Sequence, residues 1–269
     1  MQAPSDLAND LLHLGVQLGD TLMVHASLRA IGPVEGGADG VLDALERAFG
    51  PEGTLLMILG AQIAHDFVNH LPEAERPALL ADAPPFDVAT APVLPEVGTL
   101  AEKFRKRPST SVNDNPSGRF GASGRLAHDL LHDAPWHDYY GPRSPLDRFC
   151  RIGGRVLRLG ASADTTTVLH YAEYLADLPN KRRVRRHYVC LGADSPETRA
   201  IECLDDERGI VDWPGEDYFA TILREYLATG RTAQGGVGQA ASELIDAADF
   251  VRFGADWMTR HFAETVRDT

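Results

Sequence analysis

The sequence predicts an α/β domain in which helices cover a mainly parallel sheet. Two short apolar runs, residues 21–24 and 54–59, are typical of buried strands, and residues 41–49 between them have the apolar spacing of a helix. A strand, a helix and a second strand in this order indicate a right-handed crossover between parallel strands. A third strand is predicted at residues 155–159, and a helix follows it at about 167–175.

The remaining elements follow in chain order. An opening helix begins near Ser5 and ends at Gly15, since glycine is typical of a helix C-terminus. Residues 60–96 are rich in proline and predict a long irregular excursion, a connection that often serves as a lid or a binding loop. No repeat or linker divides the sequence, so we expect a single domain over residues 1–269. The other predicted elements are helices at 97–107, 125–131, from 144, 218–227, 242–250 and 254–262, and a strand near Tyr188.

Composition and charge narrow the class of protein. Hydrophobic residues make up 43% of the chain and charged residues 24%, which is typical of a globular domain. Lysine and arginine number 26 and aspartate and glutamate 39, so the net charge is −13 and neither nucleic acid nor an anionic membrane is an expected partner. No apolar run approaches the ~20 residues of a membrane-spanning helix, and the first ten residues lack the pattern of a secretory signal. Cys150, Cys190 and Cys203 lie far apart, which favours a reduced, cytoplasmic compartment.

The segment after the third strand carries the most informative polar pair. His170 and Glu173 are three residues apart and share one face of the predicted helix. A carboxylate that orients an imidazole and supports its charged form makes a plausible general base. The alternative is a surface His–Glu pair without a role in chemistry. A zinc-protease motif is excluded, because the position of its second histidine is Tyr174.

His25 and Ser27 follow the first predicted strand. Their amides and hydroxyl suit a phosphate at a turn or helix start, and a simple cap of the strand end is an equal alternative. Ser27 is not part of a G-x-S-x-G elbow, which argues against an α/β-hydrolase.

Two charged runs stand out in the second half of the chain. Residues 181–186 hold five cations, which would counter an anionic cofactor or an acidic surface, or would form a solvated loop. Residues 205–212 hold four carboxylates, Asp205, Asp206, Glu207 and Asp212, which would bind ammonium groups or form an exposed acidic loop. The acidic run lacks the spacing of a calcium-binding loop.

Taken in order, these segments resemble the aminoglycoside 3-N-acetyltransferases, the antibiotic N-acetyltransferases that use acetyl-CoA. The resemblance covers residues 6–262, and the ordered set is specific although each piece alone is weak. The matching segments are residues 24–32 (VHASLRAIG), 53–55 (GTL), 85–87 (PFD), 144–146 (SPL), 153–157 (GGRVL), 159–161 (LGA), 167–173 (TVLHYAE), 179–184 (PNKRRV) and 249–254 (DFVRFG).

The resemblance implies a three-layer α/β/α sandwich with a mainly parallel central sheet, unlike the Gcn5-type acetyltransferase fold. It implies acetyl transfer to the 3-amino group of the 2-deoxystreptamine ring, with His170 as the base and Glu173 beside it, and no metal. It places acetyl-CoA at the first strand end and at the Thr-rich loop, on His25, Ser27, Leu28, Arg29, Thr165, Thr166 and Thr167. It maps the antibiotic side to Asp212, and the charge of the acidic run adds Asp205 and Asp206. The expected assembly is a monomer or a homodimer.

One segment departs from the family pattern. Many members have R-S-x-H-P where this chain has residues 112–116, Val-Asn-Asp-Asn-Pro. The range of accepted antibiotics is therefore open. Two alternatives follow, an acetyltransferase of the same fold that acts on a different amine, and a non-catalytic protein that binds cationic antibiotics.

Overall fold

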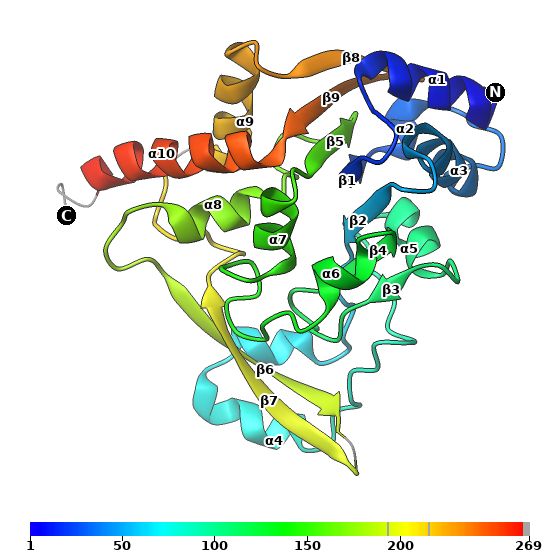
Figure 1. Cartoon of the computed structure of the whole chain (residues 1–269). Coiled ribbons are helices and arrows are strands. Elements are labelled where there is room, and N and C mark those ends of the chain that lie inside the picture. Colours follow the sequence, from blue (N-terminus) through cyan, green and yellow to red (C-terminus); the bar gives the residue numbers. More distant parts are fainter. Residues whose placement is uncertain (193, 215, 266–269) are drawn as a thin grey trace.

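The computed structural model describes residues 1–192, 194–214 and 216–265 of the chain. Its centre is a seven-stranded sheet with the strand order β3-β4-β2-β1-β5-β9-β8 (Figure 1). The strands are β1 (Thr21–Ala26), β2 (Thr54–Ile58), β3 (Ser111–Val112), β4 (Phe120–Gly124), β5 (Arg155–Leu159), β8 (Ala233–Val237) and β9 (Ala240–Asp246).

The three strands predicted from apolar runs form the parallel centre of the sheet. β1 lies between β2 and β5 and is parallel to both. On the outer sides, β4 pairs with β2 and β9 pairs with β5, both in the antiparallel direction. The predicted α/β class is confirmed, and the carboxyl ends of β1, β2 and β5 meet at one edge of the sheet, where α/β proteins usually bind ligands.

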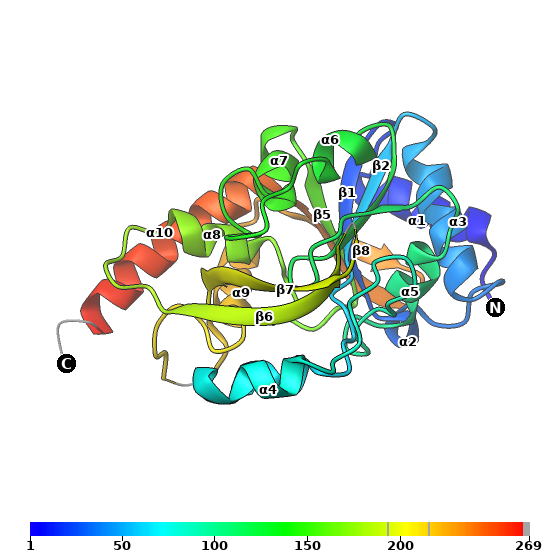
Figure 2. The ribbon, with the colours of Figure 1, turned by 90° about the horizontal axis from the view of Figure 1, so that it is seen from below.

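Helices cover both faces of this sheet, so the predicted three layers are present (Figure 2). Side chains alternate along each strand: Leu22 and Val24 on β1 pack into one hydrophobic core, and Met23 packs into the other. The first core is closed by α1 (Pro4–Leu14), α2 (Leu28–Ile31), α3 (Ala38–Phe49) and α5 (Thr99–Arg105). The second is closed by α6 (Ala127–Leu131), α7 (Pro145–Arg151), α8 (Leu169–Leu175), α9 (Tyr218–Ala228) and α10 (Ala247–Thr265).

The proline-rich excursion is attached to a separate two-stranded sheet. Strands β6 (Arg183–Leu191) and β7 (Pro196–Leu204) form a long antiparallel hairpin, and the helices of the excursion lie along it (Figures 1 and 2). The Oδ1 atom of Asn69 accepts a hydrogen bond from the His187 amide at 2.7 Å, and Arg76 donates to the Arg185 carbonyl at 2.8 Å. The helices of the excursion are η1 (Asp66–His70), η2 (Glu73–Glu75) and α4 (Arg76–Leu80), where η marks a 3-10 helix.

One predicted element is wrong. The helix expected at residues 242–250 is instead strand β9, and α10 begins at Ala247 and includes the helix predicted at 254–262. Leu244 pairs with Leu157 of β5, and this cross-strand partner, remote in sequence, outweighs the local helical spacing. β3, β4, β7 and β8 are also absent from the sequence-based prediction, while the strand expected near Tyr188 is confirmed as part of β6.

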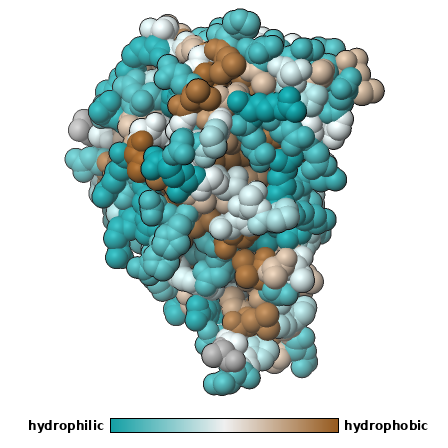
Figure 3. Space-filling view, turned by 45° about the vertical axis from the view of Figure 1, so that its right-hand side comes forward, coloured by the Kyte–Doolittle hydropathy of each residue, from teal (hydrophilic) through white to brown (hydrophobic). Residues whose placement is uncertain are grey.

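The surface matches the acidic, polar composition. On the face drawn in Figure 3 hydrophilic side chains predominate, and hydrophobic ones gather in a broken strip along its middle. Among the helices of the described residues, none combines the length and the apolar character needed to cross a membrane.

Candidate active site

His170 and Glu173 form the predicted pair near the N-terminus of α8. The chain leaves β5 at Leu159, crosses a polar loop and enters α8, which places both side chains beside the carboxyl edge of the sheet. His170 Nδ1 lies 2.8 Å from Glu173 Oε2. The carboxylate is 1% exposed, and its other oxygen accepts a hydrogen bond from the Tyr218 hydroxyl. Burial and these two partners hold Glu173 in one orientation.

Two aromatic rings fix the plane of the imidazole. Tyr140 stacks on His170 with ring centroids 4.8 Å apart and an angle of 10°, and Phe219 meets it at 4.8 Å and 66°. Nδ1 is engaged by Glu173, so the neutral ring carries its proton there and presents Nε2 as an acceptor. No residue within the described ranges bonds to Nε2, which leaves this atom available to a substrate.

Charge sets the basicity of His170. Burial by itself lowers the pKa of the imidazole, but the Glu173 carboxylate, with Asp206 and Asp217 further away, outweighs burial and raises the pKa above its ordinary value. A raised pKa makes a stronger base, which must lose its resting proton before it can act.

His170 lies at the wall of a strongly acidic cavity of about 240 Å³. This "acidic cavity" is also lined by the aromatic rings of Trp213, Tyr218 and Phe219, and by the single cation Arg208. Six carboxylates of one cavity attract ammonium groups. They belong to Asp164, Glu173, Asp206, Glu207, Glu216 and Asp217.

A second and larger cavity, of about 780 Å³, opens at the carboxyl ends of β1, β2 and β5. This "strand-end cavity" is lined by all seven residues that the sequence assigned to the cosubstrate: His25, Ser27, Leu28, Arg29, Thr165, Thr166 and Thr167. The two cavities share His170, Phe219 and Asp164, so they meet at the imidazole. A ligand in each would bring its reactive group to the same atom.

The strand-end cavity has features that fit an extended polar ligand. His25 is 8% exposed, and its Nε2 atom is buried without a partner in the described part of the chain. Burial, together with the nearby Arg158, lowers the pKa of His25 to about 3, so the ring is neutral. A buried, unpaired ring nitrogen at a cavity wall suits a hydrogen-bonding ligand. Ser27 instead caps α2 by accepting from the Ala30 amide at 3.3 Å.

Arg158 holds the polar loop of the strand-end cavity in shape. Its side chain is 2% exposed and donates to the Ala161 and Ser162 carbonyls, both at 2.9 Å. It also donates to the Thr165 carbonyl at 3.0 Å and the Thr166 hydroxyl at 2.8 Å. A single buried guanidinium therefore organises four residues of this loop.

The three acidic residues predicted for the antibiotic side lie in different places. Asp206 lines the acidic cavity. Asp205 is buried and accepts hydrogen bonds from the Glu207 and Arg208 amides, which makes it part of the turn rather than of the cavity wall. The Asp212 side chain is 98% exposed, is paired with Arg182 and lines neither cavity.

The divergent segment at residues 112–116 also lines neither cavity. Asn113 accepts from the Phe120 amide at 2.6 Å and donates to the Gly118 carbonyl at 2.9 Å. Asn115 accepts from the amides of Ser117 and Gly118, each at 3.0 Å. Both asparagines close a loop of the chain on itself.

The basic run 181–186 faces the acidic surface of its own chain. Arg182 pairs with Asp212, and Arg186 pairs with Asp206 at 2.7 Å. Of the alternatives for this run, the structure supports the neighbouring acidic surface.

Sequence reasoning missed the residues that surround the imidazole. Tyr140, Tyr218 and Phe219 come from segments remote from α8, and no spacing in the sequence connects them to His170. The only local signal was Asp217, which caps α9 by accepting from the Phe219 amide at 2.7 Å and so fixes where Tyr218 and Phe219 begin the helix.

Comparison with known proteins identifies the family. The family model described as aminoglycoside 3-N-acetyltransferase matches residues 23–259. The chain belongs to this family. It is 39% identical over 254 residues to aminoglycoside N(3)-acetyltransferase III of Pseudomonas aeruginosa, a match that covers 94% of this chain and 92% of the relative.

Solved structures of the family agree with this assignment. The complex of AAC-IIIb with CoASH superposes with a TM-score of 0.90 at 36% identity, with 96% of each chain covered. The sisomicin-bound AAC-VIa has a TM-score of 0.90 at 37% identity, with 96% of this chain and 98% of that chain covered. The predicted family, the acetyltransferase activity and the acetyl-CoA cosubstrate are thereby confirmed.

Proposed function

We propose that this enzyme transfers the acetyl group of acetyl-CoA to the 3-amino group of the 2-deoxystreptamine ring of aminoglycosides, with His170 as general base, and thereby confers resistance. The observation that carries the proposal is the position of His170 at the junction of the acidic and strand-end cavities. Two solved relatives support one ligand for each cavity, since AAC-IIIb binds CoASH and AAC-VIa binds sisomicin.

Each cavity has the chemistry of its proposed ligand. The acidic cavity has six carboxylates among its lining residues, and their combined negative charge suits a polyamine. In the strand-end cavity the neutral His25, the Arg29 cation and the hydroxyl-rich loop suit a long ligand with amide and phosphate groups. We therefore assign acetyl-CoA to the strand-end cavity and the antibiotic to the acidic cavity.

The reaction needs one proton moved twice. As the amine nitrogen attacks the thioester carbonyl carbon, His170 Nε2 accepts the proton that the amine loses. The carbon–nitrogen bond forms, the carbon–sulfur bond breaks, and the imidazolium returns the proton to the departing sulfur. Glu173, hydrogen bonded to Nδ1 at 2.8 Å, stabilises the imidazolium between the two transfers.

Negative charge develops on the carbonyl oxygen during the attack, and Thr167 is the side chain best placed to meet it. The Thr165 hydroxyl donates to the Ser162 carbonyl at 2.7 Å, and the Thr166 hydroxyl is buried against Arg158. The Thr167 hydroxyl has no partner within the described residues and lines the strand-end cavity with His170. We assign it as the oxyanion donor.

The decisive test is thiol release from acetyl-CoA with separate aminoglycosides as acceptors, for the wild type and His170→Ala. We expect turnover with at least one antibiotic, and a loss in kcat of about 100-fold to 10,000-fold in the variant. Acetyl-CoA binding, measured by calorimetry, should be nearly unchanged. An unchanged kcat in His170→Ala would refute the base. Silence of the wild type towards every antibiotic, with acetyl-CoA still bound, would instead point to a different amine.

A further inference from the structure

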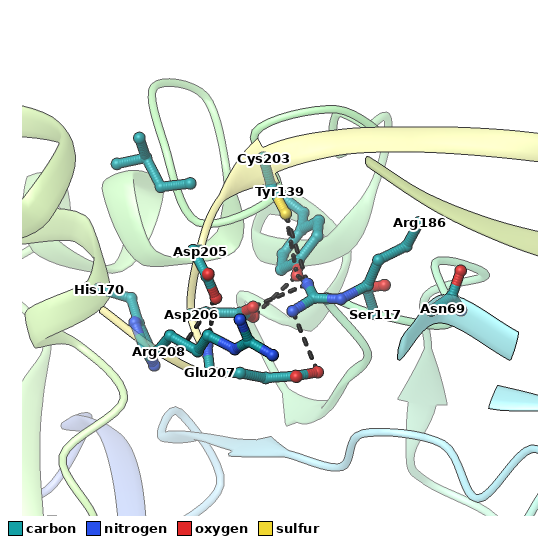
Figure 4. A network of polar contacts seen from close by, with 12 residues as sticks. Asn69, Ser117, Tyr139, His170, Arg186, Cys203, Asp205, Asp206, Glu207 and Arg208 are labelled. Carbon is teal, nitrogen blue, oxygen red and sulfur yellow. Dashed lines mark hydrogen bonds and ion pairs between the residues drawn. The ribbon is translucent and has the colours of Figure 1, made fainter. Parts of the chain in front are cut away.

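A buried arginine lies beneath the acidic cavity. Arg186 belongs to β6, and its side chain is 8% exposed. Figure 4 shows its guanidinium beside Tyr139, Asp206 and Glu207. Nη1 lies 2.7 Å from Asp206 Oδ1, and Nη2 lies 3.1 Å from Glu207 Oε1. These two carboxylates both line the acidic cavity, at adjacent positions after β7. One guanidinium therefore binds two neighbouring members of the cavity wall.

A second buried group completes the arrangement. The Tyr139 hydroxyl accepts from Arg186 Nη1 at 2.9 Å and donates to Asp206 Oδ2 at 2.8 Å. Both oxygens of Asp206 are thus engaged, one in an ion pair and one in a hydrogen bond, and Tyr139 is 1% exposed. The carboxylate of Asp206 cannot turn without breaking two buried contacts.

A cation under a cavity for cations needs a physical reason. Six carboxylates around about 240 Å³ repel one another, and this repulsion favours conformations in which their side chains move apart, away from the cavity. A guanidinium behind the wall offsets this repulsion while Asp206 and Glu207 remain among the residues that line the cavity, and its planar fork can bind two acceptors at once.

We propose that Arg186 is a positioning residue for acceptor recognition, which holds the carboxylates of Asp206 and Glu207 in the wall of the acidic cavity, where their negative charge attracts the ammonium groups of the substrate. This inference rests on the proposed function, since it takes the acidic cavity as the acceptor site. Arg186 acts through the two carboxylates and touches neither the acetyl group nor His170.

The first test measures steady-state kinetics with sisomicin for Arg186→Met and Arg186→Lys. In Arg186→Met we expect the KM for sisomicin to rise by about tenfold or more, as for the loss of a charge-assisted contact. The KM for acetyl-CoA should stay within about twofold of the wild-type value, since the substitution weakens the binding of sisomicin only. Arg186→Lys keeps the positive charge but not the planar guanidinium, so its KM for sisomicin should lie between the values of the wild type and Arg186→Met.

The matched control is Arg183→Met on the same strand. Arg183 is half-exposed and pairs with Asp138 at 2.8 Å outside both cavities, so its removal should leave the KM for sisomicin and the KM for acetyl-CoA unchanged. Should Arg186→Met fail to fold, Tyr139→Phe provides the second variant. It removes the hydroxyl that accepts from Arg186 and donates to Asp206 but keeps the ion pair between them, so it should also raise the KM for sisomicin, by less than Arg186→Met.

A mutant cycle separates positioning from a general structural role. In the background Asp206→Asn with Glu207→Gln, the added Arg186→Met should change the KM for sisomicin little, because its effect passes through those carboxylates. Two results would overturn the inference about Arg186 and leave the proposed function intact. One is a rise in KM from Arg186→Met that is as large in that background as in the wild type. The other is an unchanged KM for sisomicin in both Arg186→Met and Tyr139→Phe. A wild type that neither acetylates nor binds sisomicin or any other aminoglycoside would overturn the proposed function as well.

Discussion

His170 is constrained on three sides, and each contact has a separate consequence. Glu173 selects the tautomer, Tyr140 and Phe219 hold the ring plane, and the open side faces the junction of the cavities. Because the pKa of His170 is raised above 6.5, the ion pair also stabilises the fold. That contribution is complete below pH 6.5, the unfolded value, and is lost as the pH rises through the higher folded pKa.

Glu173→Gln should move the pH dependence of kcat. The base must be neutral to act, so activity rises as the pH passes the pKa of His170. Without the carboxylate that raises it, this pKa falls, and the acidic limb of the kcat profile should shift to lower pH while the plateau drops. Steady-state rates from pH 5 to 9 test this, and a limb that stays in place would contradict the assignment of His170.

Thr167→Val should lower kcat by about 100-fold to 1000-fold, the effect of removing one oxyanion donor. Thr165→Val is the matched control, since its hydroxyl is already bonded to the Ser162 carbonyl and the substitution should cost far less. Equal losses in the two variants would mean that neither hydroxyl is the donor.

At the scale of elements, the loop between β5 and α8 joins the two cavities. It carries the threonines of the strand-end cavity, and α8 then presents His170 to both. The loop forms no helix or strand and has a few turn hydrogen bonds of its own, such as the Thr165 amide to the Ser162 carbonyl at 3.1 Å. Arg158 adds four more contacts that hold the loop together. The negative partner of Arg158 is Glu243 on β9, with Nε and Oε2 3.4 Å apart.

Arg158→Met should therefore raise the KM for acetyl-CoA by about tenfold and destabilise the fold, because it leaves several buried acceptors unpaired. Arg155→Met on the same strand is the control. Arg155 donates to the Gly15 carbonyl at 2.9 Å, away from both cavities. Its substitution should therefore lower the Tm without changing the KM for acetyl-CoA. Thermal unfolding and initial rates measure both effects. An Arg158→Met protein that is less stable but has an unchanged KM would contradict the role of the loop.

At the scale of the whole molecule, a net charge of −13 and a cavity with six carboxylates act on the two substrates in opposite ways. The field steers a polycationic antibiotic toward the protein and opposes the approach of an anionic cosubstrate. Salt screens both effects, since the Debye length falls from about 10 Å at 0.1 M to about 3 Å at 1 M.

We therefore expect salt to lower kcat/KM for the antibiotic and to leave kcat/KM for acetyl-CoA unchanged or slightly raised. Initial rates from about 0.02 to 0.5 M KCl, a range over which the Debye length becomes short compared with the protein, give the dependence of kcat/KM on salt for each substrate. If kcat/KM fell equally with salt for both substrates, salt would be acting on the stability of the fold rather than on attraction to the acidic cavity.

Local patterns in the sequence determined the strand-end cavity and the His–Glu pair. The strands β1, β2 and β5 are short apolar runs, and parallel strands bring their carboxyl ends to one edge, so the residues that follow β1 and β5 had to meet there. His170 and Glu173 are three residues apart on one helix, which fixed their contact before any tertiary structure was known.

Tertiary structure alone decided what surrounds that pair. The local apolar spacing at β9 predicts a helix, but the segment is a strand because it pairs with β5. Tyr140 and Tyr218 approach His170 and Glu173 from distant segments, and Arg186 joins β6 to Asp206 across the hairpin. Spacing reports only neighbours within about two helical turns or along one strand, whereas these contacts depend on how whole elements pack against one another.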